Sequence, residues 1–492
     1  MKVKTVGLLS LCGMLLSSVT VWSLTKERKL TPTAAQDGSQ QIAADLGPEP
    51  SQSQGAIFTA GRAIMLEGRL GHATLSADRP GENFLLLTAT AERDVSTASS
   101  TPLNLSIVID RSGSMKGRRL NNAADAARGM LGRLRDGDVV SLVTYNTTTE
   151  VVVPSTTIDS FSRDRVQRAL SQITASGDTC ISCGIDAGME QLRRRSDMTS
   201  RILLLSDGEA TTGIRSVEEF RRLASRVRDL GASISAIGVD VQYNERVMSA
   251  LALESNGRHH FVENASQLPA VFDTEFASLV KTLAKDSEVS VELAPGVRVR
   301  QVFDRSFRQE GNRLIVPFGT FSAGEEKTLL VKLDVDRGAA GTRPVADVRM
   351  TYDDFGAGGR GSCEGKLSVD LVEGDALAAL DPVVQTRLLR SQTVGALNEA
   401  NRLFTSGRRD EAQRKLKASL DDLNRQRVAA IAAAPAPKRA KLEQDFKGQS
   451  AALGEASDGF AAPPSAEPGS ASAPRPAAQV RRNASTAVDM AF

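Results

Sequence analysis

The chain has 492 residues, of which 41% are hydrophobic and 24% are charged, and its formal net charge is +2. This length and composition provide apolar material for more than one core, so a multidomain protein is expected. The near-neutral charge and an aromatic content of 4% argue against nucleic acid as a partner.

The amino-terminal segment, residues 1–24, has the features of an export signal. Lys2 and Lys4 precede an apolar stretch over residues 6–24, which is the pattern of a basic region followed by a hydrophobic region. Its length lies between that of a long signal peptide and that of a marginal membrane anchor. We therefore expect an exported protein that is periplasmic, on the cell surface, or held in the membrane by this segment alone.

Two short regions follow the export segment. Residues 25–54 are predicted to form a polar linker. Residues 55–100 are predicted to be β-rich, because short strand-like pieces alternate with turns over residues 56–92.

One carboxylate and two hydroxyls come directly after a predicted buried strand. Residues 105–109 are mainly apolar, as in a strand buried on both faces. The chain then supplies Asp110, Ser112 and Ser114 before an amphipathic helical stretch over residues 120–134. Oxygen atoms of this kind suit a small, hard divalent cation. A polar turn that caps the next helix is the alternative interpretation.

Two later loops favour the metal site over the polar turn. Thr179 precedes a helical stretch over residues 184–194, and Asp207 follows a second predicted buried strand at residues 201–205. Loops at the carboxyl ends of neighbouring parallel strands meet in one crevice. The residues expected to lie together there are Asp110, Ser112, Ser114, Thr179 and Asp207.

These five residues, in this order, resemble the metal-ion-dependent adhesion site of von Willebrand factor type A (VWA) domains. The resemblance covers about residues 102–285, where strands and helices alternate, and implies a doubly wound α/β domain over residues 101–285. It also implies that the five side chains bind one divalent cation, with Mg²⁺ favoured and Ca²⁺ or Mn²⁺ as alternatives. A carboxylate from a partner protein would complete the coordination. The domain order resembles that of exported bacterial relatives of calcium-activated chloride channel regulators and inter-α-trypsin inhibitor heavy chains.

Cys180 and Cys183 stand immediately after Thr179, at a predicted helix start. Three interpretations stay open: a local disulfide in an oxidising compartment, buried free thiols, or a pair with a redox or zinc-binding function. No thioredoxin-like unit surrounds the pair, and no second cysteine or histidine pair stands at a zinc-binding spacing. A disulfide that stiffens the metal loop is therefore favoured.

Three regions follow the VWA-like domain. Residues 286–374 contain strand candidates between turns and predict a β-sandwich, which the strands before residue 100 are expected to join. Residues 375–456 have helical periodicity and predict a hairpin or small bundle. Residues 457–492 are rich in Ala, Pro, Ser and Gly and predict a disordered tail. The expected architecture is multidomain: a central doubly wound α/β domain with a parallel sheet, a flanking β-sandwich and a C-terminal helical segment.

The sequence favours binding over catalysis. It contains no nucleophile elbow, no phosphate-binding glycine loop and no His-Glu-x-x-His motif, so an enzyme is not expected. His259 and His260 are adjacent in a predicted strand and should point to opposite faces, which argues against a shared metal.

The favoured function is a divalent-cation-dependent protein-binding module of the cell envelope, for adhesion or scaffolding, that captures a carboxylate-bearing partner protein. Two alternatives stay open. The first is a VWA subunit that acts with a MoxR-type AAA ATPase in assembly or metal insertion. The second is a thiol-exchange enzyme that uses Cys180 and Cys183.

Overall fold

A computed structural model describes residues 44–48, 51–93, 101–192, 198–375, 377–461 and 475–492. The predicted export segment, residues 1–24, lies outside these residues. Within the described part of the chain, no helix is both long enough and apolar enough to cross a membrane.

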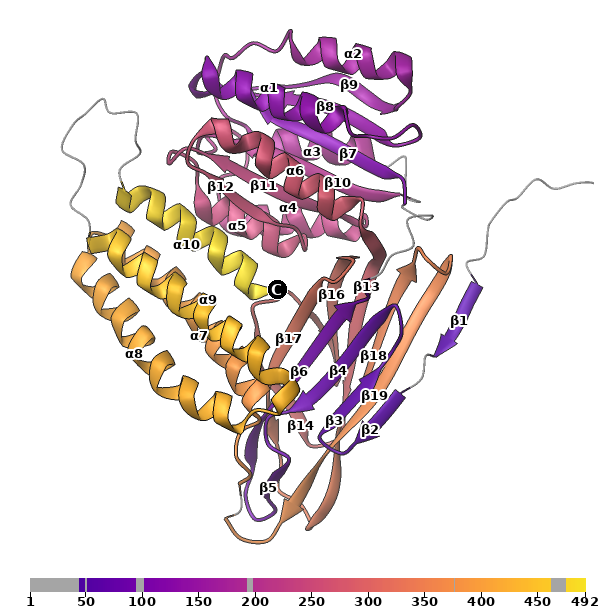
Figure 1. The fold of residues 1–492 in the computed structure, drawn as a ribbon, viewed down its shortest axis with the longest axis vertical. Coiled ribbons are helices and arrows are strands. Elements are labelled where there is room, and N and C mark those ends of the chain that lie inside the picture. The colour runs from indigo at the N-terminus through magenta and orange to yellow at the C-terminus, as the bar shows by residue number, and fades with distance from the viewer. Residues whose placement is uncertain (1–43, 49–50, 94–100, 193–197, 376, 462–474) are drawn as a thin grey trace, which may run out of the picture. The chain divides into compact units, whose positions relative to one another are not determined.

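The α/β domain is built on a six-stranded sheet with the order β12-β11-β10-β7-β8-β9 (Figure 1). All neighbours run parallel except β9, which pairs antiparallel with β8. Strands β7, β8, β10 and β11 are buried along their whole length, as expected where helices cover both faces. The strands are β7 (Leu103–Asp110), β8 (Val139–Tyr145), β9 (Thr149–Thr157), β10 (Thr199–Ser206), β11 (Ala232–Val239) and β12 (His259–Val262).

Helices cover both faces of this sheet and give two separate apolar cores. The helices α1 (Arg118–Leu131), α2 (Ser160–Leu170) and α6 (Leu268–Leu279) pack on one face. The opposite face is covered by α3 (Ile181–Leu192), α4 (Val217–Asp229) and α5 (Glu245–Glu254). Short 3₁₀ turns lie at η2 (Gly113–Met115) and η3 (Ala265–Gln267). This arrangement confirms the predicted doubly wound α/β fold.

A buried ionic network lies toward the amino-terminal ends of the central strands. Arg201 on β10 donates to Glu275 on α6, with 3.1 Å between Nη1 and Oε2, and Arg201 also donates to the Ser235 hydroxyl. His260 Nε2 lies 2.7 Å from Glu275 Oε1. The neighbouring His259 instead contacts Tyr243 and Ser249, so the two histidines point to different faces, as predicted.

Segments on both sides of the α/β domain form a two-sheet β-sandwich with one shared apolar core. One sheet has the order β14-β17-β6-β4-β3-β2, and the other has the order β1-β19-β18-β13-β16-β15, with β5 paired to β19. As expected, an early strand pairs with a late one, because β6 and β17 run antiparallel along their length. The early strands are β1 (Ala44–Pro48), β2 (Ser51–Gln54), β3 (Ile57–Ala60), β4 (Ile64–Leu70), β5 (Thr74–Ser76) and β6 (Gly81–Ala91). The late strands are β13 (Thr282–Leu293), β14 (Val297–Phe303), β15 (Arg308–Glu310), β16 (Arg313–Ser322), β17 (Glu326–Val335), β18 (Gly341–Asp354) and β19 (Gly359–Val372).

The structure corrects the predicted polar linker over residues 25–54 at residues 44–48 and 51–54, which form strands. Residues 25–43 and 49–50 of that prediction lie outside the described residues. Strand β1 pairs with β19, and β2 pairs with β3. Strand β1 takes its backbone hydrogen bonds from a strand distant in the sequence, and β2 takes them from β3, which follows it in the chain. Such pairing leaves little trace in a short polar sequence, because any residue supplies the backbone donors and acceptors.

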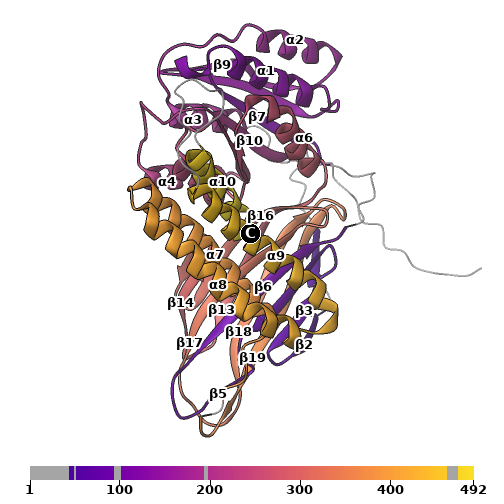
Figure 2. The same cartoon turned by 60° about the vertical axis from the view of Figure 1, so that its left-hand side comes forward.

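Three long helices follow the sandwich and lie side by side in both views (Figures 1 and 2). They are α7 (Pro382–Thr405), α8 (Arg409–Ala433) and α9 (Ala436–Ala461). The Asp381 carboxylate caps α7 by accepting from the backbone N–H groups of Val383 and Val384. Gly407, with φ of 80°, makes the turn into α8. Their shared core extends the predicted helical region to Ala461.

The predicted disordered tail over residues 457–492 is wrong for its last part. Helix α10 (Arg475–Ala491) packs against α7 and α9 and against α5 and β12 of the α/β domain (Figure 1). Val488 of α10 is buried in the core on the α3–α5 face. A composition rich in small residues predicts disorder because it has little apolar surface of its own, but this helix is ordered by burial against surfaces distant in sequence.

Candidate metal centre

Asp110 lies at the carboxyl end of β7 and is fully buried. Its Oδ1 accepts from the backbone N–H of Ser112 at 2.8 Å, and its Oδ2 accepts from the Ser206 hydroxyl at 2.8 Å. Burial raises the pKa of Asp110 to about 6, although these hydrogen bonds favour the charged form. Because burial disfavours the charged form of Asp110, a nearby cation would stabilise its carboxylate.

Asp207 comes directly after β10, the neighbour of β7, and its side chain is also buried. The Ser114 hydroxyl donates to Asp207 Oδ1 at 2.7 Å, and the hydroxyl oxygens of Ser112 and Ser114 are 3.1 Å apart. Burial raises the pKa of Asp207, against the opposing effect of the hydrogen bonds from Ser114 and Arg119. Four of the predicted residues are thus connected at the carboxyl ends of β7 and β10.

Thr179 reaches the same place from the loop before α3. A Cβ atom added to Gly208 would lie 3.6 Å from Thr179 Oγ1 and 3.7 Å from Ser114 Oγ. Both hydroxyls therefore face the same glycine, which leaves the space between them open. The backbone N–H of Gly113 donates to Gly177 O at 3.0 Å and ties the Thr179 loop to η2. The structure brings all five predicted residues into one crevice.

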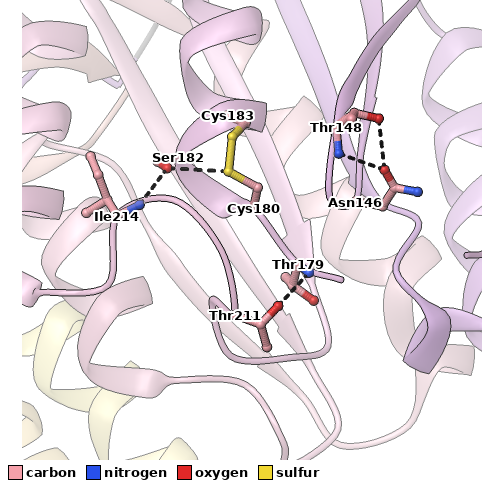
Figure 3. Close-up of a disulfide and its surroundings, with 8 residues drawn as sticks. All are labelled: Asn146, Thr148, Thr179, Cys180, Ser182, Cys183, Thr211 and Ile214. Carbon is pink, nitrogen blue, oxygen red and sulfur yellow. Dashed lines mark hydrogen bonds between the residues drawn. A yellow bond between two sulfur atoms is a disulfide. The ribbon is translucent and has the colours of Figure 1, made fainter. Parts of the chain in front are cut away.

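Thr179 is held by the loop that follows Asp207 (Figure 3). Its backbone N–H donates to Thr211 Oγ1 at 2.9 Å, and the backbone N–H of Thr211 donates back to Thr179 O at 2.9 Å. These two hydrogen bonds tie the Thr179 loop to the loop that follows Asp207.

Cys180 and Cys183 are joined by a disulfide, which confirms the predicted pairing (Figure 3). Cys180 is buried, and the adjacent Ser182 hydroxyl accepts from the backbone N–H of Ile214 at 3.1 Å. Gly213 has φ of 71°, and a Cβ atom there would lie 2.6 Å from Cys180 Sγ. The disulfide turn and the loop after Asp207 are therefore packed too closely for a side chain at residue 213.

We expect Cys180→Ser/Cys183→Ser to lower the affinity for Mg²⁺ by less than about tenfold, because the disulfide supports Thr179 without contacting the crevice directly. The loop it closes is short, so the loss in unfolding free energy should stay below about 3 kcal/mol. Calorimetry and urea unfolding measure the two effects. Cys363→Ser, in the sandwich core, is the matched control and should leave Mg²⁺ affinity unchanged. An affinity of the double variant equal to that of the control contradicts the supporting role.

Ser206 and Arg119, outside the predicted set, contact residues of the crevice, and Asp240 contacts Arg119. The Ser206 hydroxyl donates to Asp110, as described. Arg119 Nη1 lies 2.9 Å from Asp207 Oδ2 and 2.9 Å from Ser114 O, and its Nη2 donates to Asp240. Ser206 could have been noticed beside Asp207. Asp240 also follows a buried parallel strand, β11, so the rule that placed Asp207 could have found it. Arg119 could not have been found, because it lies on α1 and no spacing rule links it to the motif.

The donor chemistry of this crevice fits a hard divalent cation. It offers two carboxylates and three hydroxyls, and Mg²⁺ and Ca²⁺ prefer oxygen ligands. It offers no imidazole or thiolate of the kind that zinc or copper sites use. Within the described ranges, no cluster of three or more His, Cys, Asp or Glu side chains is arranged to hold a metal, so this mixed carboxylate and hydroxyl site is the candidate.

The family model for the von Willebrand factor type A domain matches residues 104–274. This chain contains a VWA domain. A solved structure, the von Willebrand factor type A protein from Catenulispora acidiphila, matches with a TM-score of 0.65 and 17% identity over 86% of this chain and 93% of its own. The ArnB paralogue VWA2 from Sulfolobus acidocaldarius matches with a TM-score of 0.55 and 16% identity over 80% of this chain and 98% of its own. At these identities the likeness shows a shared fold.

Sequence relatives of this chain include bacterial and animal proteins. An uncharacterised protein of Synechocystis, sll0103, is 25% identical over 59% of this chain and 70% of its own length. YfbK of Escherichia coli is 27% identical over 47% of this chain and 42% of its own. The pig inter-alpha-trypsin inhibitor heavy chain H1 is 27% identical over 38% of this chain and 22% of its own. VWA domains commonly take part in divalent-cation-dependent protein interactions and often bind divalent metal ions.

Proposed function

We propose that this chain is a divalent-cation-dependent protein-binding module of the cell envelope that captures a partner through a carboxylate. The observation that carries the proposal is the meeting of two buried carboxylates and three hydroxyls in one crevice at the carboxyl ends of β7 and β10. The residues proposed to hold the cation are Asp110, Ser112, Ser114, Thr179 and Asp207.

The electrostatics of the crevice support this role. Asp110 and Asp207 are both fully buried, and two negative charges in a poorly solvated place are stabilised by a dication. Mg²⁺ is the cation we favour, and it would supply positive charge for a partner's carboxylate. Ser114 is the exposed member of the set, so a partner would approach from its side. The same surface suits adhesion to, or scaffolding of, an acidic protein.

The burial of Cys180 supports a binding role over thiol exchange, because an exchange enzyme needs an accessible sulfur. No enzymatic activity is proposed. An assembly role with a MoxR-type ATPase is the alternative. A cytoplasmic location of the chain would favour it, since that class acts largely on the cytoplasmic side.

Affinity capture from envelope extract tests the proposal. Immobilised full chain should retain a partner with Mg²⁺ present, release it on chelation, and recover it when Mg²⁺ is restored. Asp110→Asn is the matched control. It should retain no partner whose binding depends on Mg²⁺. A partner held equally with and without chelator contradicts the proposed function.

Export is tested by a reporter fusion placed after Asp45. We expect activity of a periplasmic reporter and none of a cytoplasmic one, because Lys2, Lys4 and the apolar stretch over residues 6–24 form an export pattern. The same fusion with residues 1–24 deleted is the control and should reverse the result. A reporter active only in the cytoplasm contradicts export and favours the ATPase-partner role.

A further inference from the structure

Arg119 places a fixed positive charge at the edge of the candidate metal centre. It lies in the first turn of α1, and 28% of its side chain is exposed. Its Nη1 is shared between Asp207 Oδ2 and Ser114 O, each at 2.9 Å. The guanidinium therefore donates to one oxygen of the Asp207 carboxylate, and the Ser114 hydroxyl donates to the other. The proposed function assigns this same carboxylate to the cation.

Asp240 is the second anchor of Arg119. It pairs with Nη2 of Arg119 and lies just after β11, with φ of 65°. Non-glycine residues seldom adopt this conformation, which in many proteins marks a functional loop. Asp240 Oδ1 accepts from the backbone N–H of Val241 at 2.7 Å, which fixes the carboxylate. Arg119 is thus clamped between Asp207 and Asp240 and does not swing freely in solvent.

The positive charge of Arg119 has opposite effects on the binding of cations and of anions at the crevice. Asp110, Asp207 and Asp240 contribute three negative charges and Arg119 contributes one positive charge, so the net charge is about −2. A dication brings this to about zero. Without Arg119 the corresponding values are about −3 and −1. The guanidinium therefore weakens attraction for the cation and, once the cation is bound, strengthens attraction for an anionic ligand.

We propose that Arg119 sets the balance between cation binding and carboxylate binding at this site, with Asp240 as the residue that positions it. This inference rests on the proposed function, because it concerns the same metal centre. In this proposal, the cation and Arg119 together attract a partner's carboxylate. The same Arg119 charge lowers the affinity of the site for the cation.

The test compares Arg119→Gln with Arg118→Gln in the full chain. Arg118 is the exposed neighbour on the same helix, so its variant controls for the loss of one charge. Calorimetry with Mg²⁺ alone should show about tenfold tighter binding for Arg119→Gln, on the scale of one partly screened charge acting on a dication. With Mn²⁺ at saturation, acetate should displace metal-bound water about tenfold less readily, as read from water proton relaxation.

In Arg119→Gln, Mg²⁺ affinity should rise while acetate binding falls. Misfolding would instead lower both. Asp240→Asn provides the reverse change, and it should weaken Mg²⁺ binding without weakening acetate binding. If the unaltered chain binds no Mg²⁺, the proposed function fails. If it binds Mg²⁺ and acetate but Arg119→Gln behaves like Arg118→Gln, the metal centre stands and the role of Arg119 is overturned.

Discussion

Asp110→Asn is expected to weaken Mg²⁺ binding by at least about 100-fold while leaving the VWA domain folded. The amide keeps an oxygen that can accept from Ser112 N–H, but it removes one of the two negative charges that attract the cation. Since burial disfavours the charged carboxylate in the absence of a cation, the metal-free variant should be no less stable than the unaltered chain.

Isothermal titration with Mg²⁺ measures this effect, and urea unfolding in chelator measures stability. Asp178→Asn is a matched control, because Asp178 is an exposed carboxylate next to Thr179 that lies outside the proposed ligand set. Its affinity should stay close to that of the unaltered chain. Retention of full Mg²⁺ affinity in Asp110→Asn would refute the assignment of the site.

Glu275→Ala should lower the free energy of unfolding by about 3–5 kcal/mol. The substitution leaves the Arg201 guanidinium buried without its carboxylate and removes the partner of His260. Replacing both members, in Arg201→Met/Glu275→Leu, should recover much of the loss because no buried charge is then left uncompensated. Denaturant unfolding measures both variants. A double variant no more stable than Glu275→Ala contradicts the ionic explanation.

The same network predicts a pH dependence of stability. Burial would raise the pKa of Glu275, but the hydrogen bond from His260 and the charge of Arg201 outweigh it and lower the pKa to about 2. The folded state therefore binds this proton less readily than the unfolded state does. Its contribution, about 3 kcal/mol, is fully present above pH 4.5 and is lost as the pH falls toward 2. Glu275→Gln should flatten that part of the stability profile.

The central domain and the candidate site could be predicted because their signals are local. Buried strands such as β7 and β10 are continuous apolar runs, and a parallel sheet brings the residues after them to one edge. Asp110 and Asp207 follow from that rule alone. The same rule also placed Thr179 there, although its loop precedes a helix. The hydrogen bonds that hold this loop, to Gly113 and Thr211, depend on the fold and could not be read from the sequence.

Other features depend on distant partners and could not be predicted. Arg201 begins an apolar run whose neighbours give no sign that its charge is buried against Glu275. Arg119 is one of two adjacent arginines, and only the fold distinguishes the clamped residue from exposed Arg118. Strand β1 and the small residues of α10 are ordered by segments distant in the sequence.

Helix α10 makes the VWA domain discontinuous along the chain. Its Val488 completes a core whose other buried members lie between Val108 and Ala252. Arg481 pairs with Glu245 and donates to Tyr243 O. During synthesis, the sandwich and the bundle must emerge before this face of the domain can be covered. A recombinant fragment limited to residues 101–285 would expose that face and invite self-association. Folding should accordingly end with a late docking step in which α10 packs onto the α/β domain.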